Sequence, residues 1–128
     1  MPKQQLNINT GTAPAASPYS PGLRVGDFVF VSGQVPRDPS TGKLVGETIE
    51  EQTTQVLENI KAILAAGGAT MADVVKVNAH LTDLSLFERY NKVYVSYFPD
   101  PKPVRTTVGS QLLGFLVEID AIAYVGKD

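Results

Sequence analysis

The sequence predicts an α+β domain in which two helices pack on one face of a mixed β-sheet. Two strand–helix–strand passages precede a final pair of strands, and the apolar residues switch between a period of two and helical spacing. The chain has 128 residues, which suits a single domain spanning residues 1–128. A chain of this length can bury enough surface to fold without disulfides or a structural metal.

Four segments carry strand patterns. Residues 27–34 are apolar on both faces, which predicts a central strand covered on both sides. Residues 72–83, 104–110 and 115–125 are the other three predicted strands, rich in β-branched or alternating apolar residues. Residues 11–22 are rich in Pro, Ala, Ser and Gly, so they form either an ordered loop or a flexible arm. One face of the second strand is expected to carry Val75, Val77, Ala79 and Leu81.

Two helices are expected between these strands. The first begins near Thr48, because Thr48 and Glu51 match a capping box, and ends at a pair of glycines. A second capping-box match, Ser85 with Glu88, predicts a helix that stops before Pro99. Two helices cover only one face of a sheet, and the other face is also apolar. We therefore expect a closed symmetric oligomer that buries the second face.

Composition excludes several classes of protein. There is no cysteine, so disulfides and thiolate chemistry are absent, and the formal net charge is -2 without a basic tract. Nucleic-acid binding is therefore not expected. No apolar run reaches the ~18 residues of a membrane span, and the N-terminus lacks the apolar core of a signal peptide. These features favour a cytoplasmic protein. The single histidine, His80, is interpreted as a surface strand residue, and no metal-binding motif is present.

Arg105 and Glu118 form the most informative pair. If the last two strands make an antiparallel hairpin centred near Gln111–Leu112, the two side chains lie opposite each other, about 5 Å apart at Cβ. They then form either a solvated ion pair worth ~0–1 kcal/mol, or a site for a small organic acid. In the second case the guanidinium binds the carboxylate of the ligand, and the glutamate orients or deprotonates a water molecule.

The remaining polar candidates each have an ordinary structural explanation. Tyr19 can be a packing residue with a hydrated hydroxyl, and Ser32 can end a strand. Gly33 can relieve a tight turn, Asn91 can cap or bridge within a helix, and Thr107 can be a simple strand residue.

An ordered set of segments resembles one known family over nearly the whole chain. The segments are SPYS, VFVSGQVPRDPSTGKLVG, TTQVLENIKAILAAGGATMADVVKVNAHLTDLSLFERYN, PVRTTVGS and VEIDAIAY. Together they resemble the RidA/YjgF family of reactive-intermediate deaminases. The resemblance implies a chorismate-mutase-like fold and a homotrimer with clefts between subunits. It also implies cofactor-free hydrolysis of 2-imino acids, such as 2-iminopropanoate or 2-iminobutanoate, or their enamines, to 2-oxo acids and ammonia.

The same resemblance assigns roles to individual residues. It implies that Arg105 binds the substrate carboxylate and that Glu118 orients the water. The other implied site residues are Tyr19 as a catalytic residue and Ser32, Gly33, Asn91 and the backbone of Thr107 as substrate-binding groups. One departure is the connection SQLLGF, which lacks the leucine-proline turn of many relatives and is slightly shorter. It puts substrate preference and activity in question.

Two other functions remain open from the sequence. The chain could be a non-catalytic trimeric binder of small carboxylates, or an RNA-cleaving translation inhibitor, a role also attached to this family. Glu118 favours the enzyme, because a carboxylate trap gains nothing from a second negative charge beside its ligand. The acidic balance disfavours the RNA-cleaving role.

Overall fold

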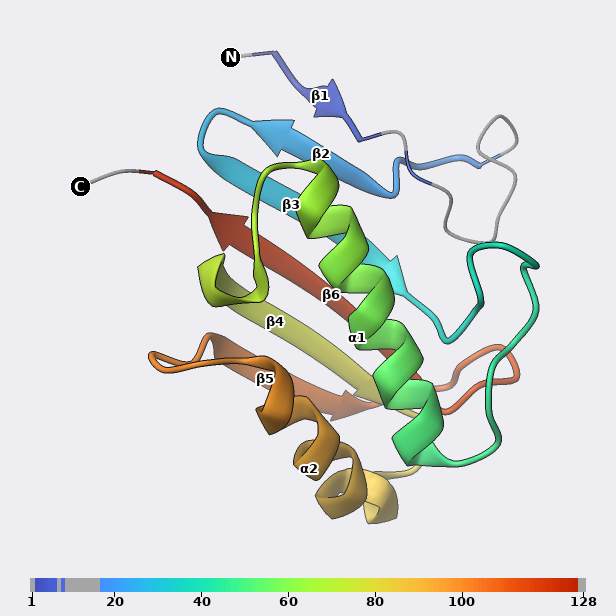
Figure 1. The fold of residues 1–128 in the computed structure, drawn as a ribbon. Helices are drawn as coiled ribbons and strands as arrows, with labels where there is room; N and C mark the ends of the chain where they lie inside the picture. The colour runs from blue at the N-terminus through green and yellow to red at the C-terminus, as the bar shows by residue number, and fades with distance from the viewer. Residues whose placement is uncertain (1, 7, 9–16, 127–128) are drawn as a thin grey trace.

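The computed structural model describes residues 2–6, 8 and 17–126. Within them six strands form one mixed sheet in the order β1-β2-β3-β6-β4-β5 (Figure 1), in which only the β4–β5 pair is parallel. Residues 9–16 lie outside the described part, so half of the predicted loop at 11–22 is not described. The strands are β1 (Gln4–Gln5), β2 (Gly22–Val25), β3 (Phe28–Gln34), β4 (Val74–Leu81), β5 (Val104–Gly109) and β6 (Val117–Tyr124).

Two α-helices, α1 (Ile49–Ala66) and α2 (Phe87–Tyr97), lie on the same face of the sheet (Figure 1). Two short 3-10 turns, η2 (Met71–Asp73) and η3 (Leu84–Leu86), precede β4 and α2. The predicted α+β class, with a mixed sheet and two helices on one face, is confirmed. No helix in the described ranges is long and apolar enough to cross a membrane.

The core lies between the helices and the sheet. The apolar stripe of α1 packs on alternate residues of the central strands, which point toward the helices because side chains alternate along a strand. Each large aliphatic side chain buried here contributes roughly 1.5–3 kcal/mol. The fully buried members include Val56, Ile60, Leu64, Val77, Leu81 and Ile119.

The ends of α1 confirm the predicted signals. Thr48 Oγ1 accepts a hydrogen bond from the Glu51 N–H at 3.2 Å, and Glu51 Oε1 accepts one from the Thr48 N–H at 3.2 Å. Gly68 follows the helix with a φ of 83°, in the left-handed region that favours glycine.

The second predicted capping box is wrong. Ser85 lies inside η3, and its N–H donates to Asp83 Oδ1 at 2.9 Å. Asp83 thus caps a 3-10 turn that was not expected, and α2 begins only at Phe87. Aspartate is a favoured N-cap residue, because its short side chain accepts a hydrogen bond from a backbone N–H of the first turn. With Asp83 as the cap of η3, the start of α2 lies later than the sequence predicts.

The predicted hairpin between the last two strands is also wrong. β5 pairs with β4 in parallel, with Arg105 in register with Val77, whereas β6 pairs with the other side of β4 and places Glu118 opposite His80. The cause is α2, which connects β4 to β5 as a crossover and returns the chain in the same direction. Glu118 is therefore not opposite Arg105.

Two smaller expectations also fail. A register shift between Val74 and Lys76 buries Val74 and turns Val75 outward, so Val75 does not share the buried face of β4. Residues 22–25, for which the sequence predicts no strand, form β2, which pairs with β3 through a turn at Gly26–Asp27. β3 is an interior strand, as predicted, and its second face is not covered by the described residues of one chain, as also expected for a single copy.

The uncovered face carries large apolar side chains. Phe28, Phe30 and Tyr124 lie on the side away from the helices and are 42%, 39% and 42% exposed. Phe28 contacts both of the others, with ring centroids 6.2 and 5.1 Å away. The single chain therefore leaves apolar surface exposed, as expected, and the oligomer that would cover it stays a prediction.

Candidate active site

Arg105 projects from β5 on the helix-bearing side of the sheet. It is in register with Val77, which is fully buried beneath the helices, and neighbours in register point to the same face. The side chain is half-buried and lies against α2. The charged side chain of Arg105, in a strand of mostly β-branched residues, thus lies against one face of α2.

Three aromatic rings and one amide hold the guanidinium of Arg105. Its Nη1 donates to Asn91 Oδ1 at 2.7 Å. Its central carbon lies 4.5 Å from the ring centroid of Tyr94, 5.5 Å from that of Phe87 and 5.8 Å from that of Tyr90. Such stacking favours a cation and restricts the orientation of the planar group. The geometry leaves the donor edges not used by Asn91 free to bind an anion.

No carboxylate among the described residues neutralises Arg105. Burial raises the pKa of Tyr94 to about 12 and also raises that of Tyr90, so both phenols are neutral at pH 7. The hydroxyl oxygens of Tyr90, Tyr94 and Thr107 are buried without a hydrogen-bond partner in the described part of the chain. Unpartnered buried polar groups are rare in folded proteins, and each one calls for a specific structural or functional explanation.

Glu118 lies elsewhere, in a cavity on the opposite side of the sheet. Its neighbours in β6, Val117 and Ile119, are buried under the helices, so Glu118 faces the side that the helices leave open. The cavity has a volume of about 440 Å³. It is lined by Tyr19, Ser32, Gly33, Val35, Arg37, Leu113, Phe115 and Glu118.

A bulge at the end of β3 shapes this cavity. The register between β3 and β6 shifts between Val31 and Gln34, and Gly33 lies at the shift. A Cβ at Gly33 would lie 2.5 Å from Glu118 Oε2, closer than atoms can approach. Glycine at this position therefore lets the carboxylate rest against the backbone, a recurrent use of a bulge beside a functional group.

Ser32 ties the N-terminal loop to the same place. Its Oγ donates to the Ser20 carbonyl at 2.6 Å, and its N–H donates to the Pro21 carbonyl at 3.0 Å. These bonds hold the segment that carries Tyr19 at the rim of the cavity, where Tyr19 is 56% exposed. Ser32 therefore positions the loop, in addition to lining the cavity.

The seven predicted site residues fall into two groups. Tyr19, Ser32, Gly33 and Glu118 share the cavity. Arg105 and Asn91 form the second group with the aromatic rings of α2, and Thr107 lies two residues along β5 on the same face. Because β4 separates β5 from β6 and the two groups lie on opposite faces, one chain does not bring them together.

The sequence prediction missed several lining residues. Arg37, Val35, Leu113 and Phe115 belong to the cavity, and nothing in the sequence marks them, because they come from irregular segments that close around Glu118. The rings around Arg105 could have been found, because Phe87, Tyr90, Asn91 and Tyr94 recur at helical spacing on one face of α2.

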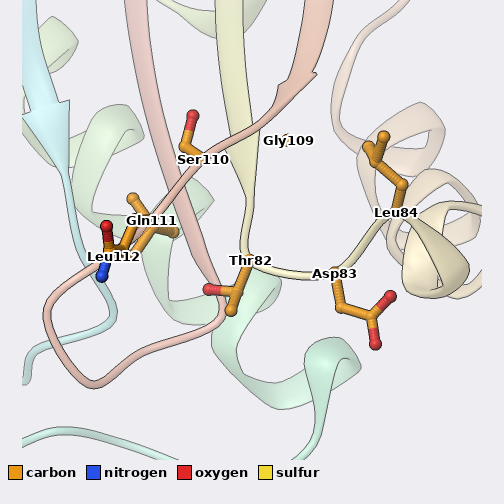
Figure 2. A pocket seen from close by; sticks show the side chains of 7 residues that line it. All are labelled: Thr82, Asp83, Leu84, Gly109, Ser110, Gln111 and Leu112. Atoms are coloured by element: carbon orange, nitrogen blue, oxygen red, sulfur yellow. The ribbon is translucent and has the colours of Figure 1, made fainter.

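Another cavity, of about 740 Å³, lies where the parallel strands β4 and β5 end (Figure 2). It is lined by the segments that follow these strands, Thr82–Leu84 and Gly109–Leu112. Two of its polar side chains already have structural partners: Thr82 Oγ1 donates to the Phe115 carbonyl at 2.7 Å, and Asp83 caps η3. It contains none of the predicted site residues. In the described ranges, no three His, Asp or Glu side chains are grouped to hold a metal ion.

Comparison with known proteins assigns the family. A family model described as Endoribonuclease L-PSP matches residues 10–125. This chain belongs to the RidA/YjgF family. It is 50% identical over 109 residues to a RutC family protein of Pyrococcus abyssi, covering 84% of this chain and 86% of that protein. It is 44% identical over 119 residues to the Reactive Intermediate Deaminase A, chloroplastic, of Arabidopsis thaliana, covering 91% and 64%.

Solved structures of the RidA/YjgF family have the same fold. The crystal structure of RidA from an Antarctic Psychrobacter matches with a TM-score of 0.87 and 41% identity, covering 95% of this chain and 99% of that one. The predicted family is confirmed, and the mixed sheet with two helices is shared with its members.

Proposed function

We propose that this chain is a hydrolytic deaminase that converts 2-imino acids, or their enamine tautomers, to 2-oxo acids and ammonia. The observation that carries the proposal is that the fold presents two groups of opposite charge that form no ion pair among the described residues: Arg105, held by Asn91 and three aromatic rings, and Glu118, which lines a cavity. One family member that the chain resembles is named a reactive intermediate deaminase. 2-Iminopropanoate and 2-iminobutanoate are the substrates that we test first.

The proposed site forms between two copies of the chain. One small acid cannot contact Arg105 and Glu118 of the same chain, because they lie on opposite faces of the sheet. Joining the Arg105 surface of one copy to the cavity of the next is a heterologous contact, and such contacts form a closed ring when the rotation between copies closes. A homotrimer satisfies this condition with three equivalent clefts. It would also cover Val104, an edge residue that is 68% exposed, and the open face around Phe28 and Phe30.

In the proposed reaction Arg105 binds the substrate carboxylate through two parallel hydrogen bonds. Glu118 of the adjacent copy holds a water molecule over the C=N carbon and accepts a proton as the C–O bond forms. The tetrahedral intermediate then collapses, the C–N bond breaks, and ammonia leaves after the nitrogen is protonated. The Tyr19 hydroxyl and the backbone at Thr107 would stabilise the nitrogen or supply protons. Imines hydrolyse in water unaided, so positioning supplies most of the acceleration.

The test generates the imine in place. An L-amino-acid oxidase with catalase converts L-alanine to 2-iminopropanoate, and semicarbazide captures the imine that escapes hydrolysis. Adding this protein should raise the yield of pyruvate at the expense of the semicarbazone. If the ratio of pyruvate to semicarbazone stays the same when this protein is added at concentrations up to that of the oxidase, the proposal is refuted.

The runner-up is RNA cleavage, which the description of the matching family model names. The protein is incubated with a labelled single-stranded RNA, with and without a ribonuclease inhibitor as the control for contaminating ribonuclease. RNA cleavage in this assay separates the two functions. Cleavage that persists in Glu118→Gln and Arg105→Lys would support the runner-up. A non-catalytic carboxylate binder would bind 2-oxo acids yet leave the semicarbazone ratio unchanged.

A further inference from the structure

A second arginine, Arg37, lines the same cavity as Glu118. We propose that Arg37 binds a second anionic group, so that the preferred substrates are 2-imino acids with a carboxylate in the side chain, of the iminosuccinate and 2-iminoglutarate type. This inference rests on the proposed function, and it names the substrate class of the same site.

The backbone directs Arg37 toward the cavity. Val35 and Arg37 both line it, while Pro36 between them is buried, as expected for an extended segment whose side chains alternate. Asn59 of α1 fixes this segment from the core side, because its Nδ2 donates to the Val35 carbonyl at 3.2 Å and to the Arg37 carbonyl at 2.9 Å. An isolated bridge between Arg37 and Leu44 adds a second attachment. The backbone that carries Arg37 is therefore held in place by several hydrogen bonds.

The guanidinium of Arg37 is anchored but not neutralised. Its Nη1 donates to the Gly42 carbonyl at 2.8 Å, which orients the group and leaves most of its five N–H donors available. Among the described residues it forms no ion pair. The chain has four arginines, of which Arg24 and Arg89 do have carboxylate neighbours, at 4.0 and 2.7 Å. In the part of the chain that the structure describes, Arg37 and Arg105 are the two without one, and they belong to the two halves of the proposed site.

The charges in the cavity explain why a second cation matters. Glu118 and a substrate side-chain carboxylate would repel each other in the same small space. Arg37 supplies the opposite charge and a planar fork that fits a carboxylate. About 440 Å³ is within the range of small-ligand sites and leaves room for a four- or five-carbon diacid. Lys43 and Lys61 do not line this cavity.

The experiment compares imines of different side-chain charge in one assay. The oxidase generates neutral imines from L-alanine and L-leucine, and an L-aspartate oxidase generates iminosuccinate, each with catalase and semicarbazide. Wild type is compared with Arg37→Gln and Arg37→Lys. Arg89→Gln is the matched control, because it removes one arginine of equal charge from an exposed ion pair on the helices. Thermal unfolding checks that all variants are folded.

We expect wild type to favour iminosuccinate over the neutral imines in kcat/KM. Arg37→Gln should lower kcat/KM for iminosuccinate by about 10- to 100-fold, the factor expected for lost hydrogen bonds to a charged group, and change the alanine-derived imine less than about 2-fold. Arg37→Lys should keep part of the preference, and Arg89→Gln all of it. An equal loss on every imine with a changed pH profile would overturn the proposal, because Arg37 would then act through Glu118.

A binding measurement separates this inference from the proposed function. NMR titration with 2-oxoglutarate and 2-oxobutanoate needs no turnover. We expect wild type to bind the diacid more tightly, and Arg37→Gln to bind both with similar affinity. Equal affinities in wild type would overturn the role of Arg37 even if imines are hydrolysed. If wild type hydrolyses no imine yet binds the diacid more tightly, the proposed reaction is refuted, and the contact between Arg37 and a second carboxylate is supported.

Discussion

The two halves of the proposed site differ in how the fold builds them. The Arg105 half is an edge strand backed by a helix, with three aromatic rings and an amide fixing one cation. The Glu118 half is a cavity closed by a bulge and three irregular segments, with Tyr19 at its exposed rim. The first half is suited to hold a constant feature, the carboxylate that every 2-imino acid carries. The second is suited to vary, and in the proposed function it would carry both the group that activates water and the contact to the substrate side chain.

The largest effect on the rate of imine hydrolysis is expected at Glu118, the proposed general base. Glu118→Gln keeps the shape of the cavity but cannot accept a proton, so imine hydrolysis should fall by about 10²- to 10⁴-fold. Binding of 2-oxobutanoate should persist, measured by NMR titration. A large loss of affinity with little loss of turnover would mean that Glu118 belongs to binding, and the division between the halves would be wrong.

A smaller loss is expected at the carboxylate anchor. Lysine at position 105 keeps the charge but offers no planar fork, and it stacks less well on Tyr94. Arg105→Lys should therefore lower kcat/KM about 10- to 100-fold, since hydrogen bonds between charged groups are weakened. The loss should be similar for neutral and diacid imines, because the anchor contacts what they share. Wild-type rates in this variant would contradict the bidentate role.

The bulge glycine should give an intermediate result. In Gly33→Ala the new methyl group would lie 2.5 Å from Glu118 Oε2, so the carboxylate must move. Misplacing a catalytic group by about 1 Å can cost up to about 10²-fold in rate. We expect kcat to fall about 10-fold or more while the Arg105 half and the far-UV circular dichroism remain unchanged. Unaltered kcat would show that the position of Glu118 over Gly33 is not needed.

The smallest effect is expected outside both halves. Arg89 donates two hydrogen bonds to Glu50, at 2.8 and 2.7 Å, and holds the pKa of Glu50 down at about 2. A carboxyl whose pKa is lowered in the folded state stabilises the fold at pH values above the pKa of the unfolded chain, which is about 4.3 for Glu. This contribution is lost as the pH falls toward the folded-state pKa of about 2. Arg89→Gln should therefore lower the melting temperature slightly at pH 7 and not at pH 2. The pair is exposed, so a large shift, or any change in turnover, would be unexpected.

The sequence predicted the elements of this fold better than their pairing. Apolar periodicity located both helices and the strands that pack on them, and the capping box at Thr48 located the start of α1. It could not tell whether β5 and β6 pair with each other, because a short connection is compatible with a hairpin or with strands on either side of β4. The crossover through α2 decides this, and it is a tertiary feature.

The same limit applies to the site. Arg105 and Glu118 could be recognised as a charged pair from the sequence, but the ladder places them on opposite faces of the sheet. Arg37 could not be recognised, because its meaning depends on a cavity formed by segments far apart in the chain. Residue types were readable from the sequence, and the surfaces on which they act were not.

Mixing two inactive variants tests the division of the site most directly. Arg105→Ala and Glu118→Gln are each purified, unfolded together in equal amounts and refolded, with each variant refolded alone as the control. If Arg105 and Glu118 of one site come from neighbouring copies of a ring, about one quarter of the clefts regain both groups, and about one quarter of wild-type imine turnover should return. If both groups act within one chain, no cleft regains both, and turnover that stays at the level of the separate variants would contradict the account.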